Sequence, residues 1–179
     1  MDLRNAVFAV LVEQDYQDLE VWYPVYRLRE TGAEVLLVGT GSAEVYTSKH
    51  GHIPAKVDRT ADQVKESELT GLIIPGGWAP ERLRQSSSVR NLVRDMFRKD
   101  KPVACICHGG WVLASAEVVK GRHLTSFPGI KDDLINAGAK WEDAEVVVDG
   151  NLITSRRPDD LPAFMREFIG LFEMVEAEA

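Results

Sequence analysis

The chain has 179 residues, of which 45% are hydrophobic and 27% are charged, values that are typical of a globular protein. This length allows a full hydrophobic core, so we predict a single domain over residues 1–179. The net charge of −7 argues against direct nucleic-acid binding, because no basic excess is available to neutralise phosphates. Two arginine pairs, Arg82 with Arg84 and Arg156 with Arg157, are interpreted as solvated surface.

The sequence has no apolar run near the roughly 20 residues that a membrane span needs, and its start lacks the pattern of a signal peptide. We therefore predict a cytoplasmic protein with no membrane contact. The two cysteines, Cys105 and Cys107, are separated by one residue, and the rise of a strand would hold their side chains about 7 Å from each other. This spacing argues against a mutual disulfide, and two free thiols suit a reducing compartment.

Apolar, β-branched segments alternate with segments of helical periodicity along the chain. The predicted strands are residues 6–12, 33–38, 72–74, 102–106, 145–148 and 152–154, the last two joined as a hairpin by the turn 149–151. The predicted helices are residues 19–31 with a kink at Pro24, 88–99, 110–116, 130–137 and 158–174. Residues 39–60 are expected to form short strands or a hairpin. Strands that alternate with helices indicate an α/β sandwich around a mostly parallel sheet.

Cys107 follows the predicted strand 102–106 directly and precedes Gly109 and Gly110, which tolerate the backbone angles of a tight turn. The carboxyl end of a parallel strand is where such sheets place their ligands. The N-terminus of the next helix is expected to lower the pKa of the thiol, and its N–H groups are suited to stabilising an oxyanion. His108 is a natural partner by type, although adjacent side chains meet only if the turn is sharp.

Simpler interpretations exist for these residues. A free cysteine is often a small buried apolar residue, and this is the preferred interpretation for Cys105, inside the strand. His50, His52 and His123 have no ligand-like grouping with cysteines or carboxylates, so no metal site is expected.

Six segments resemble the ThiJ/PfpI superfamily, specifically its branch of PfpI-type intracellular proteases and protein deglycases. They are residues 101–109 (KPVACICHG), 74–82 (IPGGWAPER), 128–133 (PGIKDD), 136–139 (NAGA), 143–151 (DAEVVVDGN) and 154–161 (TSRRPDDL). The resemblance extends from about residue 6 to residue 172. It implies a flavodoxin-like three-layer sandwich with a mostly parallel central sheet, of the class I glutamine amidotransferase-like type.

The resemblance also implies roles for individual residues. Cys107 becomes the nucleophile, with His108 as its proton partner. Glu20 matches an acidic residue on the first helix that is protonated and hydrogen-bonded to the sulfur, although alone it is an ordinary first-turn carboxylate. Glu81 matches a glutamate that reaches the histidine of a neighbouring subunit. The backbone N–H groups of Gly77 and Gly109 would form the oxyanion hole.

Four positions depart from the pattern of the relatives. Gly110 replaces a common proline, and Trp78 stands where archaeal relatives often have arginine. His52 and Phe127 stand where those relatives have tyrosines that line the pocket. The loss of two phenol hydroxyls removes possible hydrogen-bond donors, which counts against peptidase activity.

Three functions are considered. The first is a glyoxalase or deglycase that acts, without a cofactor, on small aldehydes or their early adducts with protein or nucleotide amines. The second is a PfpI-type cysteine peptidase, which needs Glu81 from a partner subunit. The third is a redox-sensing or chaperone-like stress protein, because accessible low-pKa thiols oxidise readily. We expect a homo-oligomer, either a dimer or a hexamer.

Overall fold

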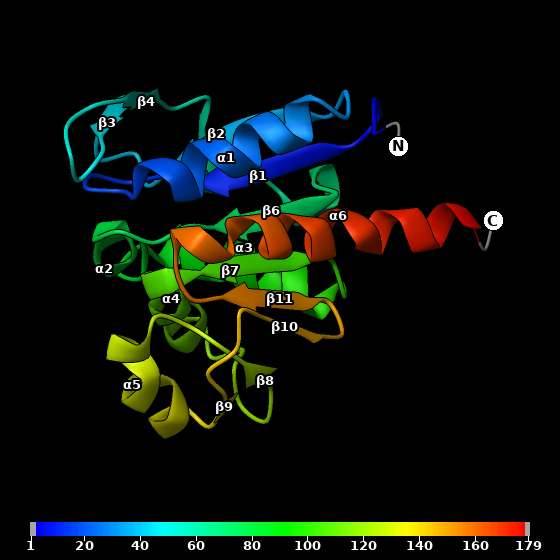
Figure 1. Cartoon of the computed structure of the whole chain (residues 1–179). Coiled ribbons are helices and arrows are strands. Elements are labelled where there is room, and N and C mark those ends of the chain that lie inside the picture. Colours follow the sequence, from blue (N-terminus) through cyan, green and yellow to red (C-terminus); the bar gives the residue numbers. More distant parts are fainter. Residues whose placement is uncertain (1–2, 178–179) are drawn as a thin grey trace.

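The computed structural model describes residues 3–177, with side chains described as far as residue 172. Within these residues the centre of the fold is a seven-stranded sheet in the order β10–β11–β7–β6–β1–β2–β5 (Figure 1). Neighbouring strands are parallel except β10 and β11, which form the predicted antiparallel hairpin. The strands are β1 (Val7–Leu11), β2 (Glu34–Gly39), β3 (Val45–Thr47), β4 (Pro54–Lys56), β5 (Arg59–Thr60), β6 (Gly71–Ile74), β7 (Val103–Ile106), β8 (His123–Leu124), β9 (Lys140–Trp141), β10 (Val146–Asp149) and β11 (Leu152–Ser155).

Helices cover both faces of this sheet. Figure 1 shows α1 and α6 on the near face and α3 and α4 on the far face. The helices are α1 (Asp18–Arg29), α2 (Ala79–Leu83), α3 (Ser87–Arg98), α4 (Gly110–Ser115), α5 (Lys131–Asn136) and α6 (Leu161–Ala177). Single 3-10 turns occupy Ala61–Gln63, Glu66–Glu68, Cys107–Gly109, Pro128–Ile130 and Pro158–Asp160. The predicted three-layer α/β fold is therefore confirmed, and no helix in residues 3–177 is long and apolar enough to cross a membrane.

The central strands are apolar along their whole length because helices cover them on both sides. Phe8 in β1 is fully buried, and its ring contacts Phe168 and Phe172 of α6 edge-to-face at centroid distances of 5.7 and 5.3 Å. Gly71 in β6 allows this close packing, because a Cβ there would lie 2.8 Å from the Phe168 ring. The core therefore fixes α6 against the middle of the sheet.

The predicted elements match the observed ones to within a few residues, and α1 continues through Pro24. Residues 39–60 do form short strands. Of these, β3 and β4 pair as a separate antiparallel hairpin, while β5 joins the edge of the main sheet beside β2. No strand was predicted at the parallel pair β8 and β9, each two residues long. Strands this short carry no readable periodicity.

The strand order positions the site. Apart from the two-residue edge strand β5, which is parallel to β2, the parallel strands run β2–β1–β6–β7–β11, the flavodoxin-like order 2-1-3-4-5 when they are counted along the chain. Ligands of such sheets bind beyond the carboxyl ends of the strands, near the point where the strand order reverses. In Figure 1 these ends lie on the left, beside α2 and α4.

Candidate active site

A cavity of about 270 Å³ opens at the carboxyl ends of the parallel strands. Its walls come from segments that follow β1, β6, β7 and β11, together with the segment after β3 and the loop before α5. The lining residues are Gln17, Glu20, Lys49, Gly77, Trp78, Cys107, His108, Phe127, Arg157 and Pro158. The fold thus brings Glu20 and Gly77, which are distant in the sequence, to the adjacent residues Cys107 and His108.

Cys107 lies on the sharp turn that links β7 to α4. Its φ angle is +62°, a conformation that non-glycine residues rarely adopt and that costs on the order of 1–3 kcal/mol. Gly109 makes the turn possible, because a Cβ at that position would lie 2.7 Å from the carbonyl oxygen of Ile74 and 2.8 Å from the sulfur of Cys105. The Cys107 side chain is 8% exposed, so the sulfur reaches the cavity from a largely buried position.

Glu20 lies in the first turn of α1 and is fully buried. The Gln17 side chain caps this helix by accepting a hydrogen bond from the Glu20 N–H at 2.9 Å. Glu20 Oε2 accepts the Gly76 N–H at 2.8 Å, while Oε1 makes no hydrogen bond of normal geometry within the described residues. A Cβ on Gly76 would lie 2.6 Å from both Glu20 Oε2 and the Cβ of Cys107, so glycine is required for the carboxyl group and the thiol to approach each other.

The thiol of Cys107 and the carboxyl group of Glu20 interact directly and titrate as a pair. Burial raises the pKa of Glu20 to about 7, against the opposing effect of the Gly76 N–H. Burial and then the Glu20 charge raise the pKa of Cys107 to about 12, although hydrogen bonds from the N–H groups of His108 and Gly77 oppose them. Near neutral pH, Glu20 therefore exchanges its proton readily beside the sulfur.

The expected lowering of the thiol pKa by the following helix is wrong for this structure. The direction is reversed because desolvation of a largely buried sulfur, together with a carboxylate beside it, outweighs the two N–H donors. Activation of the sulfur therefore requires a nearby group that removes its proton.

His108 lies within reach of this sulfur. Its Nδ1 lies 3.3 Å from the sulfur of Cys107, so the sharp turn brings the two adjacent side chains together. The imidazole stacks on Phe127 at a centroid distance of 4.8 Å and contacts the rings of Trp78 and Trp111, each at 5.2 Å. Burial, and then the positive charge of Lys49, lower its pKa below the ordinary value, so the ring is neutral and able to accept a proton at neutral pH.

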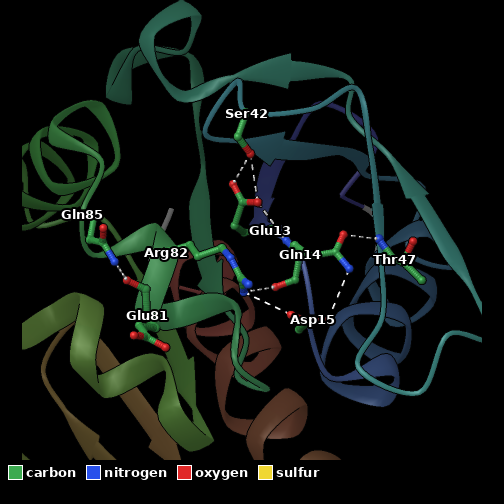
Figure 2. Close-up of polar contacts among 8 residues, drawn as sticks. All are labelled: Glu13, Gln14, Asp15, Ser42, Thr47, Glu81, Arg82 and Gln85. Atoms are coloured by element: carbon green, nitrogen blue, oxygen red, sulfur yellow. Dashed lines mark hydrogen bonds and ion pairs between the residues drawn. The ribbon is translucent and has the colours of Figure 1, made fainter.

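Gly77 closes the cavity on the side of β6 with a φ angle of +79°. A Cβ there would lie 2.5 Å from both the carbonyl oxygen of Asp15 and the backbone nitrogen of Gln17. The Asp15 carbonyl oxygen also accepts the Trp78 N–H at 2.9 Å. Arg82 in α2 pairs with the Asp15 carboxylate at 3.1 Å and fastens the two segments together (Figure 2).

The family model of the DJ-1/PfpI family matches residues 7–171. The chain belongs to the DJ-1/PfpI family. A deglycase of Pyrococcus horikoshii is 50% identical over 163 residues, which cover 91% of this chain and 97% of the relative. A candidate cysteine protease of Bacillus subtilis is 40% identical over 92% of this chain and 97% of the relative.

A solved DJ-1/PfpI-like structure has the same fold. It is a two-domain protein from Anabaena variabilis that also contains a ferritin-like domain. It superposes with a TM-score of 0.92 at 36% identity, over 94% of this chain and 48% of that protein. The match therefore spans about half of the Anabaena protein.

Of the predicted site residues, Gly109 is not among those that line the cavity, and neither is Glu81. Glu81 is exposed in the first turn of α2, where its backbone carbonyl accepts a hydrogen bond from Gln85 at 3.0 Å. Figure 2 shows its carboxylate without a contact to the other residues drawn. Within one chain, Glu81 is thus not part of the cavity that contains His108.

Phe127 and His52, which stand where archaeal relatives have tyrosines, differ in their position relative to the cavity. Phe127 lines the cavity and stacks on His108. His52 does not line it and instead stacks on His50 at a centroid distance of 6.2 Å.

Among the described residues, no group of three His, Cys, Asp or Glu side chains is arranged to hold a metal ion.

Three of the four arginines interpreted as solvated surface have structural contacts instead. Arg82 pairs with Asp15, and Arg84 donates to Ser115 Oγ at 2.8 Å. Arg156 makes two bonds to the Asp160 carboxylate and one to Asp143. Arg82 is still exposed, as predicted, whereas Arg84 and Arg156 are half-buried, so the surface interpretation does not hold for these two. Ser115 and Asp143 are partners that only the fold brings close, while Asp160 lies four residues after Arg156 in the sequence.

Arg157 and Lys49 are cavity residues that sequence reasoning missed. Arg157 has a weak local signal, since it lies in the family-like segment 154–161. Lys49 has none, because it reaches the cavity from the β3–β4 hairpin, far along the chain from β7.

Proposed function

We propose that this protein is a cysteine-dependent enzyme that acts on reactive aldehydes, or on the early adducts that they form with protein or nucleotide amines. The observation that carries this proposal is the group of three side chains at the cavity floor: the Cys107 sulfur, a neutral imidazole 3.3 Å from it, and a buried carboxyl group with a pKa of about 7. The name of the Pyrococcus horikoshii relative, a deglycase, supports the same chemistry.

The reaction begins with proton removal and addition. His108 Nδ1 takes the thiol proton of Cys107, and the sulfur attacks the aldehyde carbon. A C–S bond forms while the carbonyl π electrons move to the oxygen, which then takes a proton to give a hemithioacetal. The N–H groups of Gly77 and His108, which point at the sulfur, are suited to stabilising the developing oxyanion. Gly109 stays a predicted donor to that oxyanion.

Glu20 accounts for the rearrangement that follows. With methylglyoxal as substrate, its carboxylate takes the proton from the carbon bonded to sulfur, and the adjacent carbonyl carbon gains a proton. The hydroxyl proton on the first carbon moves to the oxygen on the second, so that the first oxygen becomes a carbonyl and the second a hydroxyl. The product is a lactyl thioester on Cys107. Water then cleaves the C–S bond, releases lactate and restores the thiol, so that one methylglyoxal and one water give one lactic acid. A carboxyl group with a pKa of about 7 is suited to both giving and taking protons at neutral pH.

A PfpI-type peptidase is the second candidate. Its support is the exposed Glu81 carboxylate, which is free to reach His108 of a partner subunit, and the candidate cysteine protease of Bacillus subtilis. This function requires a homo-oligomer, dimer or hexamer, whose interface places Glu81 of one subunit beside His108 of the next. Under the aldehyde proposal, Cys107, His108 and Glu20 of one chain suffice.

A redox-sensing or chaperone-like role is the third proposal. Its support is the free thiol of Cys107 at the cavity, while the burial and raised pKa of this thiol count against it. A cytoplasmic location also stays a proposal. The same holds for a single domain over residues 1–179, because residues 1, 2, 178 and 179 lie outside the described part of the chain.

The test is lactate release from methylglyoxal by the purified protein, with Cys107→Ser and Cys105→Ala measured beside it. We expect turnover that Cys107→Ser abolishes and that Cys105→Ala retains, because only the sulfur of Cys107 lines the cavity. Peptide hydrolysis by the same samples, with Glu81→Gln, measures the second candidate. Absence of lactate above the Cys107→Ser background would overturn the aldehyde proposal.

A further inference from the structure

The cavity holds two cations that the proposed reaction does not use. Lys49 and Arg157 both line it, and Glu20 is the one acidic side chain among the lining residues. Neither cation forms an ion pair within 4 Å with any residue of the described range 3–177. The cavity therefore has an excess of positive charge in a protein whose net charge is −7.

The adjacent residues Arg156 and Arg157 differ in their ion pairs. Arg156, the preceding residue, has its charge neutralised by Asp160 and Asp143 at 2.9 and 2.8 Å. Arg157 is exposed, directly follows it and lies at the cavity without an ion pair within 4 Å, although its charge contributes to the lowered pKa of Asp143. In an acidic protein, an arginine left unpaired beside a reactive thiol is available to an anion from solution.

Lys49 acts electrostatically on the reacting groups. Its ammonium group lowers the pKa of both Glu20 and His108, which shows that its charge is felt at the cavity floor. Trp78 and Phe127 also line the cavity and place aromatic rings around His108. A ligand in this space would meet both aromatic rings and two cationic groups.

We propose that Lys49 and Arg157 select carbonyl substrates that carry a carboxylate, a specificity that rests on the proposed aldehyde function. A guanidinium group binds a carboxylate through two parallel hydrogen bonds, and an ammonium group adds a point charge. The small volume of the cavity, about 270 Å³, suits a carboxylate that lies only a few bonds from the reacting carbon. Neutral aldehydes would then react, but with lower kcat/KM than anionic ones.

The test uses two alkylating reagents that differ only in charge. Iodoacetate and iodoacetamide both form a C–S bond with Cys107 and release iodide, and peptide mass spectrometry measures each rate at this cysteine. The ratio of the iodoacetate rate to the iodoacetamide rate is divided by the same ratio for a small free thiol. The iodoacetamide rate also reports whether the thiol of each variant is still accessible.

We expect a normalised ratio of about 10 in the wild-type protein. Lys49→Gln and Arg157→Gln should each lower this ratio about threefold to fivefold, as expected for exposed charges. Added salt should lower the ratio as well. The matched control is the double variant Lys56→Gln/Arg166→Gln, which removes the same charge from exposed positions outside the cavity.

A normalised ratio near one, or a ratio that the control lowers as much as Lys49→Gln/Arg157→Gln does, would overturn the proposal. Because alkylation needs no turnover, this result is independent of the lactate assay. A protein that prefers iodoacetate but releases no lactate would refute the aldehyde function and leave carboxylate selection in place.

Discussion

The fully buried carboxyl group of Glu20 makes the stability of the fold depend on pH in a predictable direction. Its pKa is raised from 4.5 to about 7, chiefly by burial. The folded state therefore binds this proton more tightly than the unfolded state does. The stabilisation is complete below the unfolded pKa and is lost as the pH rises through 7.

The magnitude follows from the same two values. The full difference corresponds to about 3 kcal/mol, and most of it, about 2–3 kcal/mol, is lost between pH 5 and pH 8. Glu20→Gln keeps the size of the side chain and an oxygen that can accept the Gly76 N–H, but it removes the titration. The free energy of unfolding of the wild-type protein should thus fall, relative to that of Glu20→Gln, by this amount across the interval.

Urea unfolding of both proteins at pH 5, 6, 7 and 8 measures this difference. His108 also titrates, but it is present in both proteins and cancels in the comparison. Glu34→Gln, which removes an exposed carboxylate of β2, is the control and should follow the wild-type curve. Parallel curves for the wild type and Glu20→Gln would refute the claim that the carboxyl group is protonated in the fold near neutral pH.

Three further predictions follow from the packing and the charges of the site. Gly109→Ala should lower the free energy of unfolding by about 1–3 kcal/mol and disturb the turn, because its Cβ would lie 2.7 Å from a backbone oxygen. In the control Gly170→Ala, the new Cβ would have no atom within 4 Å, so urea unfolding should show an unchanged or higher free energy of unfolding. Phe8→Ala should lower the free energy of unfolding by about 3–5 kcal/mol, because this ring is fully buried, and a loss under 1 kcal/mol would contradict the packing. Lys49→Gln should raise the pKa of His108 in an NMR titration, since the lysine charge lowers it; a fall or no change would contradict that assignment.

Local patterns sufficed for the sheet and for the position of the reactive turn. The buried strands were predicted because apolar, β-branched runs such as β1 and β7 have no other stable environment in a protein of this size. The sharp turn at Cys107 was predicted from a strand that ends directly before glycines, and its φ of +62° agrees with that prediction.

Other features depend on distant segments, which local patterns do not describe. Glu20 has the local signature of a first-turn carboxylate, and only the resemblance placed it beside the sulfur; its burial follows from the close approach of Gly76. The direction of the Cys107 pKa was predicted wrongly because burial is a property of the folded molecule. Lys49 reaches the cavity from the β3–β4 hairpin, which no periodicity links to β7.

The most direct test of the central claim is the identity of the atom that carries the substrate during turnover. The protein is mixed with methylglyoxal, quenched in acid within the first turnovers, digested and mapped by mass spectrometry. We predict a lactyl or hemithioacetal modification on the peptide that contains Cys107, and none on this peptide in Cys107→Ser. Undiminished lactate release by Cys107→Ser, with no modification of Cys107 in the wild type, would contradict the account.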